Sequence, residues 1–146
     1  MLPNLRKRFT AYVVFQGAEH RRWWRIYTRR GWRHCWLILP ATEPGASLFA
    51  RPGSILINQW ISCLRVDYST QSPEAICRQV LDEGATCIVE FAVDQKFTGA
   101  YVPRGLMTCV SLIKAVVGCN AWHVLTPEQL ARWLLRHGGK LVENPT

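Results

Sequence analysis

The hydrophobic and polar positions of this chain follow a strand period in much of its first half and a helical period in three later segments. Alternating or continuous apolar runs predict strands. They cover residues 10–16, 34–39 and 86–94, with two strands or one bent strand over 54–68. Residues 20–28 fit a half-exposed strand, and the turn-rich segment 41–53 leaves room for a short strand over 48–50. Pro40 is expected to stop the strand that begins at His34, and Asn58-Gln59 to interrupt the region 54–68.

Three helices are predicted from their start and stop signals. They run from Ser72-Pro73 to Gly84, from the segment 106–108 to Gly118, and from Thr126-Pro127 to Gly138-Gly139. Each has a serine or threonine as its N-cap, with Thr108 in that position in the second helix, and glycine follows each end. The order of elements predicts an α+β fold, a small antiparallel sheet packed against two or three helices. We expect one domain over residues 1–146, made of a basic arm (1–9) and an α+β body (10–146).

Positive charge is concentrated near the N-terminus. The net charge is +8, and residues 1–40 hold nine lysine or arginine residues against the single acid Glu19. This asymmetry indicates an anionic partner, which is nucleic acid, an anionic polymer or an acidic protein surface, although a solvated basic edge gives the same composition. The expected contact residues are Arg6, Lys7, Arg8, Arg21, Arg22, Arg25, Arg29 and Arg30. Aromatic residues interleave with the arginines of 20–30, which suits phosphate contact combined with base stacking.

Several classes of function lack their usual sequence signals. No apolar run approaches the ~20 residues that span a bilayer, and the first residues do not resemble a secretory signal. We therefore expect synthesis in a cytoplasm and no membrane span. The six cysteines form no CxxC pair and lie in apolar stretches, which predicts reduced, buried thiols, with no metal and no cofactor. Glycine-rich phosphate loops, a GxSxG elbow and usefully spaced carboxylate pairs do not occur.

Cys109 is the residue with the clearest chemical potential. It follows the N-cap Thr108, so its thiol faces the unpaired amides and the positive end of the helix dipole. Both effects favour thiolate over thiol, which suits a nucleophile. Packing of a small thiol against an apolar core gives the same pattern and stays open as the alternative.

Four histidines compete for the role of general base. His20 lies among arginines, His123 in a connection between helices, and His137 at the end of the last helix. Only His34 opens a strongly apolar strand, which would hold its ring in a fixed orientation. We therefore favour His34 as the base, with an ordinary half-buried histidine as the alternative.

A catalytic histidine needs a polar group that orients its ring. Asn58 interrupts the apolar segment that follows His34 and is the favoured orienter. Gln59 is the alternate, and Glu90 or Asp94 on a later strand are weaker candidates.

A histidine on an early strand, a polar residue on the next and a cysteine at a later helix start resemble circularly permuted papain-like hydrolases. That family includes NlpC-type cell-wall peptidases and lecithin retinol acyltransferase-like enzymes. The resemblance implies that Cys109 is the nucleophile, His34 the base and Asn58 the orienter. One departure from the pattern is that no side chain near Cys109 suits an oxyanion hole, which leaves that role to backbone amides of the helix start.

Short motifs also resemble small proteins encoded by phages and prophages. The motifs are Arg33-His34-Cys35-Trp36, then Thr108-Cys109-Val110 with Lys114 and Gly118, and finally residues 125–130. The similarity as a whole covers about residues 30–137. Two functions are therefore expected as alternatives. One is a phage-encoded cysteine hydrolase acting on an amide bond in peptidoglycan or protein. The other is a non-catalytic virion component, such as a head, connector or tail part, whose residues 1–40 contact DNA or a neighbouring subunit and which is incorporated in the particle.

Overall fold

The computed structural model describes residues 7–17, 30–41, 53–60, 63–95 and 108–143. Within these residues the strands are β1 (Lys7–Gln16), β2 (His34–Pro40), β3 (Ser54–Trp60), β4 (Cys63–Ser69), β5 (Cys87–Gln95) and β6 (Lys140–Leu141). The helices are α1 (Pro73–Asp82), α2 (Cys109–Val117) and α3 (Pro127–Arg136). The expected α+β fold is confirmed. The strands expected over 20–28 and 48–50 lie outside the described residues.

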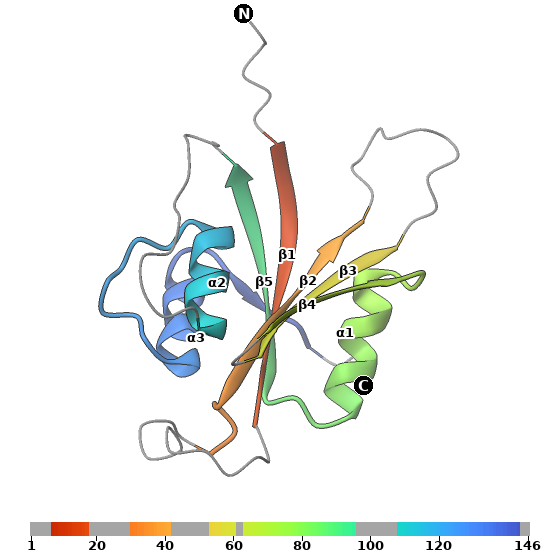
Figure 1. Ribbon diagram of the computed structural model, residues 1–146, viewed down its shortest axis with the longest axis horizontal. Helices are drawn as coiled ribbons and strands as arrows, with labels where there is room; N and C mark the ends of the chain where they lie inside the picture. Colours follow the sequence, from red (N-terminus) through yellow and green to blue (C-terminus); the bar gives the residue numbers. More distant parts are fainter. Residues whose placement is uncertain (1–6, 18–29, 42–52, 61–62, 96–107, 144–146) are drawn as a thin grey trace, which may run out of the picture.

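The strands form one antiparallel sheet with helices on both faces. Their order is β4-β3-β2-β1-β5-β6. Figure 1 shows α1 on one face of the sheet and α2 with α3 on the other. Side chains of the central strand β1 point alternately to the two faces and pack against the helices on each face. Val13 packs in the core that contains Ile113 of α2 and Leu130 of α3, whereas Val14 packs in the core that contains Ile76 of α1.

β1 begins earlier than its apolar pattern predicts. Residues 7–9 were expected to belong to the basic arm, but Lys7 already pairs with Gln95 of β5. Arg8 forms an ion pair of 3.6 Å with Asp94, the residue opposite it in the register. Ladder hydrogen bonds and this cross-strand pair extend the strand beyond the apolar residues. The rest of the arm lies outside the described residues.

The region 54–68 forms two strands, but their division differs from the expected one. Asn58 and Gln59 lie inside β3, opposite Arg65 and Leu64 of β4, and do not separate the strands. Both side chains are half-buried, and the ladder with β4 keeps these polar residues within the strand. Pro40 is the last residue of β2 and pairs with Ser54, a position where a missing amide donor costs little.

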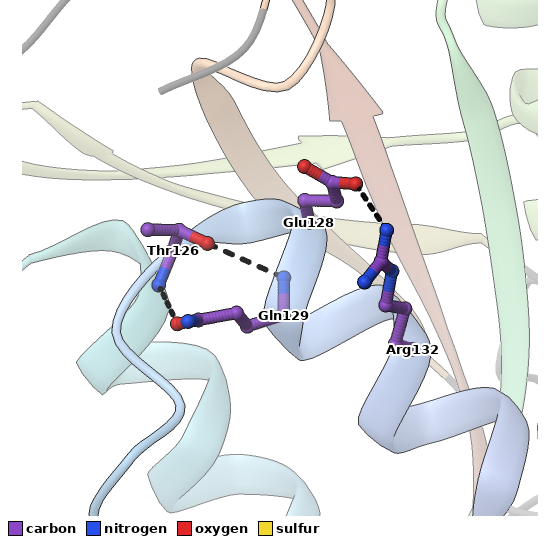
Figure 2. A network of polar contacts seen from close by, with 4 residues as sticks. All are labelled: Thr126, Glu128, Gln129 and Arg132. Carbon is purple, nitrogen blue, oxygen red and sulfur yellow. Dashed lines mark hydrogen bonds and ion pairs between the residues drawn. The ribbon is translucent and has the colours of Figure 1, made fainter. Parts of the chain in front are cut away.

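The predicted helix signals are present in all three helices. Ser72 caps α1, while Thr108 and Thr126 form capping boxes at α2 and α3. In α3, the Thr126 side chain accepts from the Gln129 amide, and Gln129 Oε1 accepts from the Thr126 amide (Figure 2). Residues 106 and 107, which we expected within the second helix, lie outside the described residues, and α2 itself begins at Cys109. None of these described helices is long and apolar enough to cross a membrane.

Two features of the described residues were not expected from the sequence. The short edge strand β6 pairs with β5, through Leu141 opposite Val89. All six thiols are free, as expected, but they are not all buried: Cys63 is exposed, and Cys87 and Cys109 are half-buried. Cys63 begins β4, an edge strand whose first four residues are exposed.

A buried lysine of α2 forms hydrogen bonds with the segment that connects α2 and α3. Lys114 is buried, and its Nζ donates hydrogen bonds to the carbonyl oxygens of Ala121 (2.7 Å) and Val124 (3.1 Å). The ammonium group therefore satisfies carbonyls of a segment that has no regular secondary structure. This contact keeps α3 close to the helix that bears Cys109.

Replacing Lys114 with methionine is expected to lower the free energy of unfolding by about 2–4 kcal/mol, because two charge-assisted hydrogen bonds are lost and the carbonyls stay buried. Urea unfolding followed by circular dichroism measures the change. Lys140→Met, at an exposed position in β6, is the control and should change stability by less than about 0.5 kcal/mol. Equal effects of the two substitutions would contradict the role of Lys114.

Candidate active site

The start of α2 places Cys109 in the first helical position. Thr108 Oγ1 accepts a hydrogen bond from the Ser111 amide (3.1 Å), and Ser111 Oγ accepts one from the Thr108 amide (2.7 Å). At the other end, Gly118 has a φ of 76°, which a residue with a side chain rarely adopts. Both predicted boundaries are therefore confirmed. The reciprocal cap makes the backbone around Cys109 rigid.

His34 and Asn58 contact each other across neighbouring strands. His34 is buried at the first position of β2, and Asn58 lies in β3, the strand that pairs with β2. The distance from His34 Nε2 to Asn58 Oδ1 is 2.7 Å. With Nε2–H donating to this carbonyl oxygen, Nδ1 is the ring nitrogen left to face the thiol. The two residues favoured by sequence as base and orienter are thus brought together.

Cys109 accepts hydrogen bonds from both of the residues that open β2. The hydrogen bond from the Cys35 side chain has the largest effect on the pKa of Cys109 and lowers it. Burial raises this pKa, whereas the hydrogen bond and charge of His34 and the backbone amide of Cys35 lower it further. Together they lower the pKa of Cys109 to about 4. At neutral pH this half-buried sulfur is therefore a thiolate, the form that attacks electrophiles.

The neighbouring thiolate changes the ionisation of His34. Burial alone lowers the pKa of His34, but the hydrogen bond and negative charge of Cys109, with the hydrogen bond to Asn58, outweigh it and raise the pKa above its ordinary value. The result is a Cys109 thiolate hydrogen-bonded to an imidazole whose pKa is raised by that contact. Such a pair contains both a nucleophile and a proton donor for a leaving group.

Cys35 is a member of this cluster that sequence reasoning placed only in the core. It is fully buried in β2, and burial together with the neighbouring Cys109 raises the pKa of its thiol. It therefore stays protonated and donates its S–H to the Cys109 thiolate. Alternation along a strand places adjacent side chains on opposite faces, so the sequence contains no signal that His34 and Cys35 both reach Cys109.

The other proposed bases and orienters lie elsewhere or have other contacts. Glu90 and Asp94 belong to β5, which is separated from β2 by β1. His137 stacks on Trp133 at a ring-centroid distance of 4.1 Å, and its Nδ1 lies 2.8 Å from the Trp133 carbonyl oxygen. His123 is exposed beside Trp122. His20 lies outside the described residues. Gln59 follows Asn58 in β3, but it is Asn58 that meets the His34 ring.

The expected anion-contact residues are only partly described. Arg6, Arg21, Arg22, Arg25 and Arg29 lie outside the described residues, and the side chain of Lys7 is not described. Arg8 lies near the start of β1, whereas Arg30 lies beyond its far end, where Arg33 donates its amide to Gln16. The described arginines therefore do not form one cluster.

A cavity of about 710 Å³ lies beside the strand end that carries His34. Gln16, Arg30, Arg33 and Trp36 contribute to its lining. The Nε atom of Arg33 is buried and has no hydrogen-bond partner in the part of the chain that is described. Within the same residues, no three histidine, cysteine or acidic side chains are grouped closely enough to hold a metal ion.

Comparison of the chain with protein families, curated proteins and solved structures finds no match. The chemical interpretation of the cluster therefore depends on its geometry and on the residue types that form it. Cys109, Cys35, His34 and Asn58 are hereafter called the thiolate cluster.

Cys109 is expected to react with iodoacetamide at a much lower pH than Cys87, which is also half-buried. The pKa of Cys109 is lowered to about 4, whereas burial raises that of Cys87 to about 11. Alkylation of Cys109 should therefore continue below neutral pH and fall only as the pH drops through about 4, because the thiolate is then protonated. Peptide mass spectrometry after timed alkylation measures both rates. Parallel pH profiles for the two cysteines would contradict the charged state of Cys109.

Replacing Cys35 with alanine is expected to raise the pKa of Cys109, because its main hydrogen-bond donor is lost. The acid limb of the Cys109 alkylation profile should move to higher pH. Cys119→Ala is the matched control, since Cys119 is equally buried in the same core cluster. A similar displacement in both variants would show that core packing, and not the Cys35 hydrogen bond, sets the pKa.

Proposed function

We propose that this chain is a phage-encoded, papain-like cysteine hydrolase module that cleaves an amide bond in peptidoglycan or in a protein. The observation that supports it is the paired Cys109 and His34, with the imidazole held by Asn58. Structural packing alone does not require a lowered cysteine pKa beside an oriented histidine. Perturbed ionisation in such a specific arrangement is typical of functional sites.

The first step of the proposed reaction is attack by the Cys109 thiolate on the carbonyl carbon of the amide. The carbonyl oxygen gains negative charge as the carbon–sulfur bond forms. The Ser111 amide donates to the Thr108 side chain and the Leu112 amide to the Thr108 carbonyl oxygen. These two bonds of the cap do not use the amides of Cys109 and Val110, which are the proposed donors to the oxyanion. This arrangement replaces the oxyanion-hole side chain that the sequence lacks.

The second step is collapse of the tetrahedral intermediate, in which the carbon–nitrogen bond breaks. The His34 imidazolium gives its proton to the leaving amine and becomes neutral. His34 can then accept a proton from water, which attacks the thioester and releases the carboxylic acid. The hydrogen bond to Asn58 keeps the same ring nitrogen facing the sulfur through both proton transfers.

The order of the residues supports the resemblance to permuted papain-like enzymes. His34 and Asn58 precede Cys109 in the chain, on two adjacent antiparallel strands, and the cysteine opens a helix that packs against that sheet. The antiparallel sheet with helices is the coarse architecture such a site requires. The finer assignment to the permuted papain-like family stays part of this proposal.

Hydrolysis should depend on the members of the thiolate cluster in a graded way. Cys109→Ala should abolish the release of new amino groups from peptidoglycan sacculi or a denatured protein, and His34→Ala should reduce it by roughly 10²- to 10⁴-fold. Asn58→Ala should reduce kcat with a smaller change in KM, whereas Asn58→Asp, which keeps an oxygen acceptor, should retain more activity. Gln59→Ala is the neighbouring control and should resemble the wild type.

Turnover by the Cys109→Ala variant equal to that of the wild type would overturn the hydrolase proposal. Absence of turnover on both substrates, together with fast alkylation of Cys109, would instead favour the second candidate, a non-catalytic virion component. The cavity that Arg30 and Arg33 line together with Glu83 is the observation that favours an anionic neighbour in that case, since the buried Nε of Arg33 has no hydrogen-bond partner among the described residues.

A further inference from the structure

β4 forms one edge of the sheet, and its outer side is open in the described structure. The strand order places β4 last, with β3 as its neighbour. All seven residues of β4 pair with β3 in continuous register, from Cys63 opposite Trp60 to Ser69 opposite Ser54. A regular edge strand presents a second row of amide and carbonyl groups, which are able to pair with another strand. The opposite edge, β6, has only two residues.

The side chains of β4 leave an apolar row exposed at this edge of the sheet. Leu64, Val66 and Tyr68 are 48%, 58% and 59% exposed, and their alternate positions place them on one face. The strand contains no lysine, proline or bulge, and its two charged residues, Arg65 and Asp67, have opposite signs and pair with each other. The apolar row continues onto β3, because Ile55 and Ile57 lie opposite Tyr68 and Val66 and are only half-buried.

The charges of β4 make its sequence complementary to itself. Arg65 and Asp67 flank Val66, which is the central residue of the strand, and their side chains form an ion pair of 2.6 Å. An antiparallel copy centred on Val66 would place Arg65 opposite Asp67 of the second copy, and Asp67 opposite its Arg65. The same register places Leu64 opposite Tyr68. Opposite charges and apolar pairs are thus matched along the strand.

We propose that β4 pairs with β4 of a second copy of this chain, antiparallel and about a two-fold axis at Val66, to form a continuous sheet across the dimer. A two-fold interface requires one surface to be complementary to itself, and the flanking Arg65 and Asp67 meet this requirement. A different protein would need an unrelated strand with the same apolar row and charge order. The inference is independent of the hydrolase proposal, because it uses no residue of the thiolate cluster.

Sedimentation equilibrium of the wild-type chain should show a concentration-dependent dimer. Val66→Lys should give a monomer with an unchanged circular dichroism spectrum, because residue 66 is exposed and two lysines would meet at the axis. Leu141→Lys is the control: Leu141 is 54% exposed at the opposite sheet edge, and this variant should remain a dimer. A wild-type chain that stays monomeric up to its solubility limit, or a Val66→Lys variant that still dimerises, would overturn the proposal.

A charge exchange tests the register directly. Arg65→Asp places only acids at positions 65 and 67, and Asp67→Arg places only arginines there. Each variant alone should dimerise roughly tenfold or more weakly than the wild type, because like charges then lie opposite each other. An equal mixture should form the mixed dimer, in which every pair is again opposite in sign. Failure of the mixture to associate better than either variant alone would contradict the antiparallel register.

A cysteine at the axis provides a positive test. Opposed residues in an antiparallel pair have Cα atoms about 4.5–5.5 Å apart, within the range that a disulfide can bridge. Val66→Cys, made in a Cys63→Ser background, should therefore form a covalent dimer on mild oxidation. Leu141→Cys in the same background is the control and should not. Equal cross-linking of both variants would indicate random collision and would overturn the proposed axis.

Discussion

The contact between the start of α2 and the start of β2 is the constraint on which the candidate site depends. A thiolate removed from water needs hydrogen-bond donors and a nearby cation, or it becomes protonated. The start of β2 supplies both, through the Cys35 thiol and backbone amide and through His34. On the α2 side of this contact, the reciprocal hydrogen bonds between Thr108 and Ser111 fix the backbone that carries Cys109. The relation of α2 to β2 therefore matters more to the chemistry than any single residue does.

β3 connects the thiolate cluster with the proposed dimer edge. Asn58, which meets His34, lies opposite Arg65, the residue whose ion pair with Asp67 makes β4 complementary to itself. An edge hairpin that is paired on one side only opens more readily than a central strand. Pairing of β4 with a second copy would restrict that opening and so hold Asn58 in place. The two proposals have separate tests, but both involve β3, which carries Asn58 and pairs with β4.

Local signals explain which parts of the structure were predictable. The caps at Ser72, Thr108 and Thr126 involve residues within one helical turn, so the sequence alone indicates where these helices begin. The Asn58-Gln59 pair was misplaced because polar residues resemble a turn, whereas pairing with β4 keeps them in a strand. β6 was missed because two residues show no periodicity, and its formation depends on β5.

The sequence by itself determined the α+β class, the helix boundaries and the residue types able to form a thiol site, because each depends on neighbours along the chain. Only the tertiary structure decided that Asn58 is the partner of His34, that Cys35 joins the site, and that the apolar residues of β4 are exposed. These facts depend on strand register and on the docking of α2 against β2. Both are contacts between segments far apart in the chain, for which local propensity contains no information.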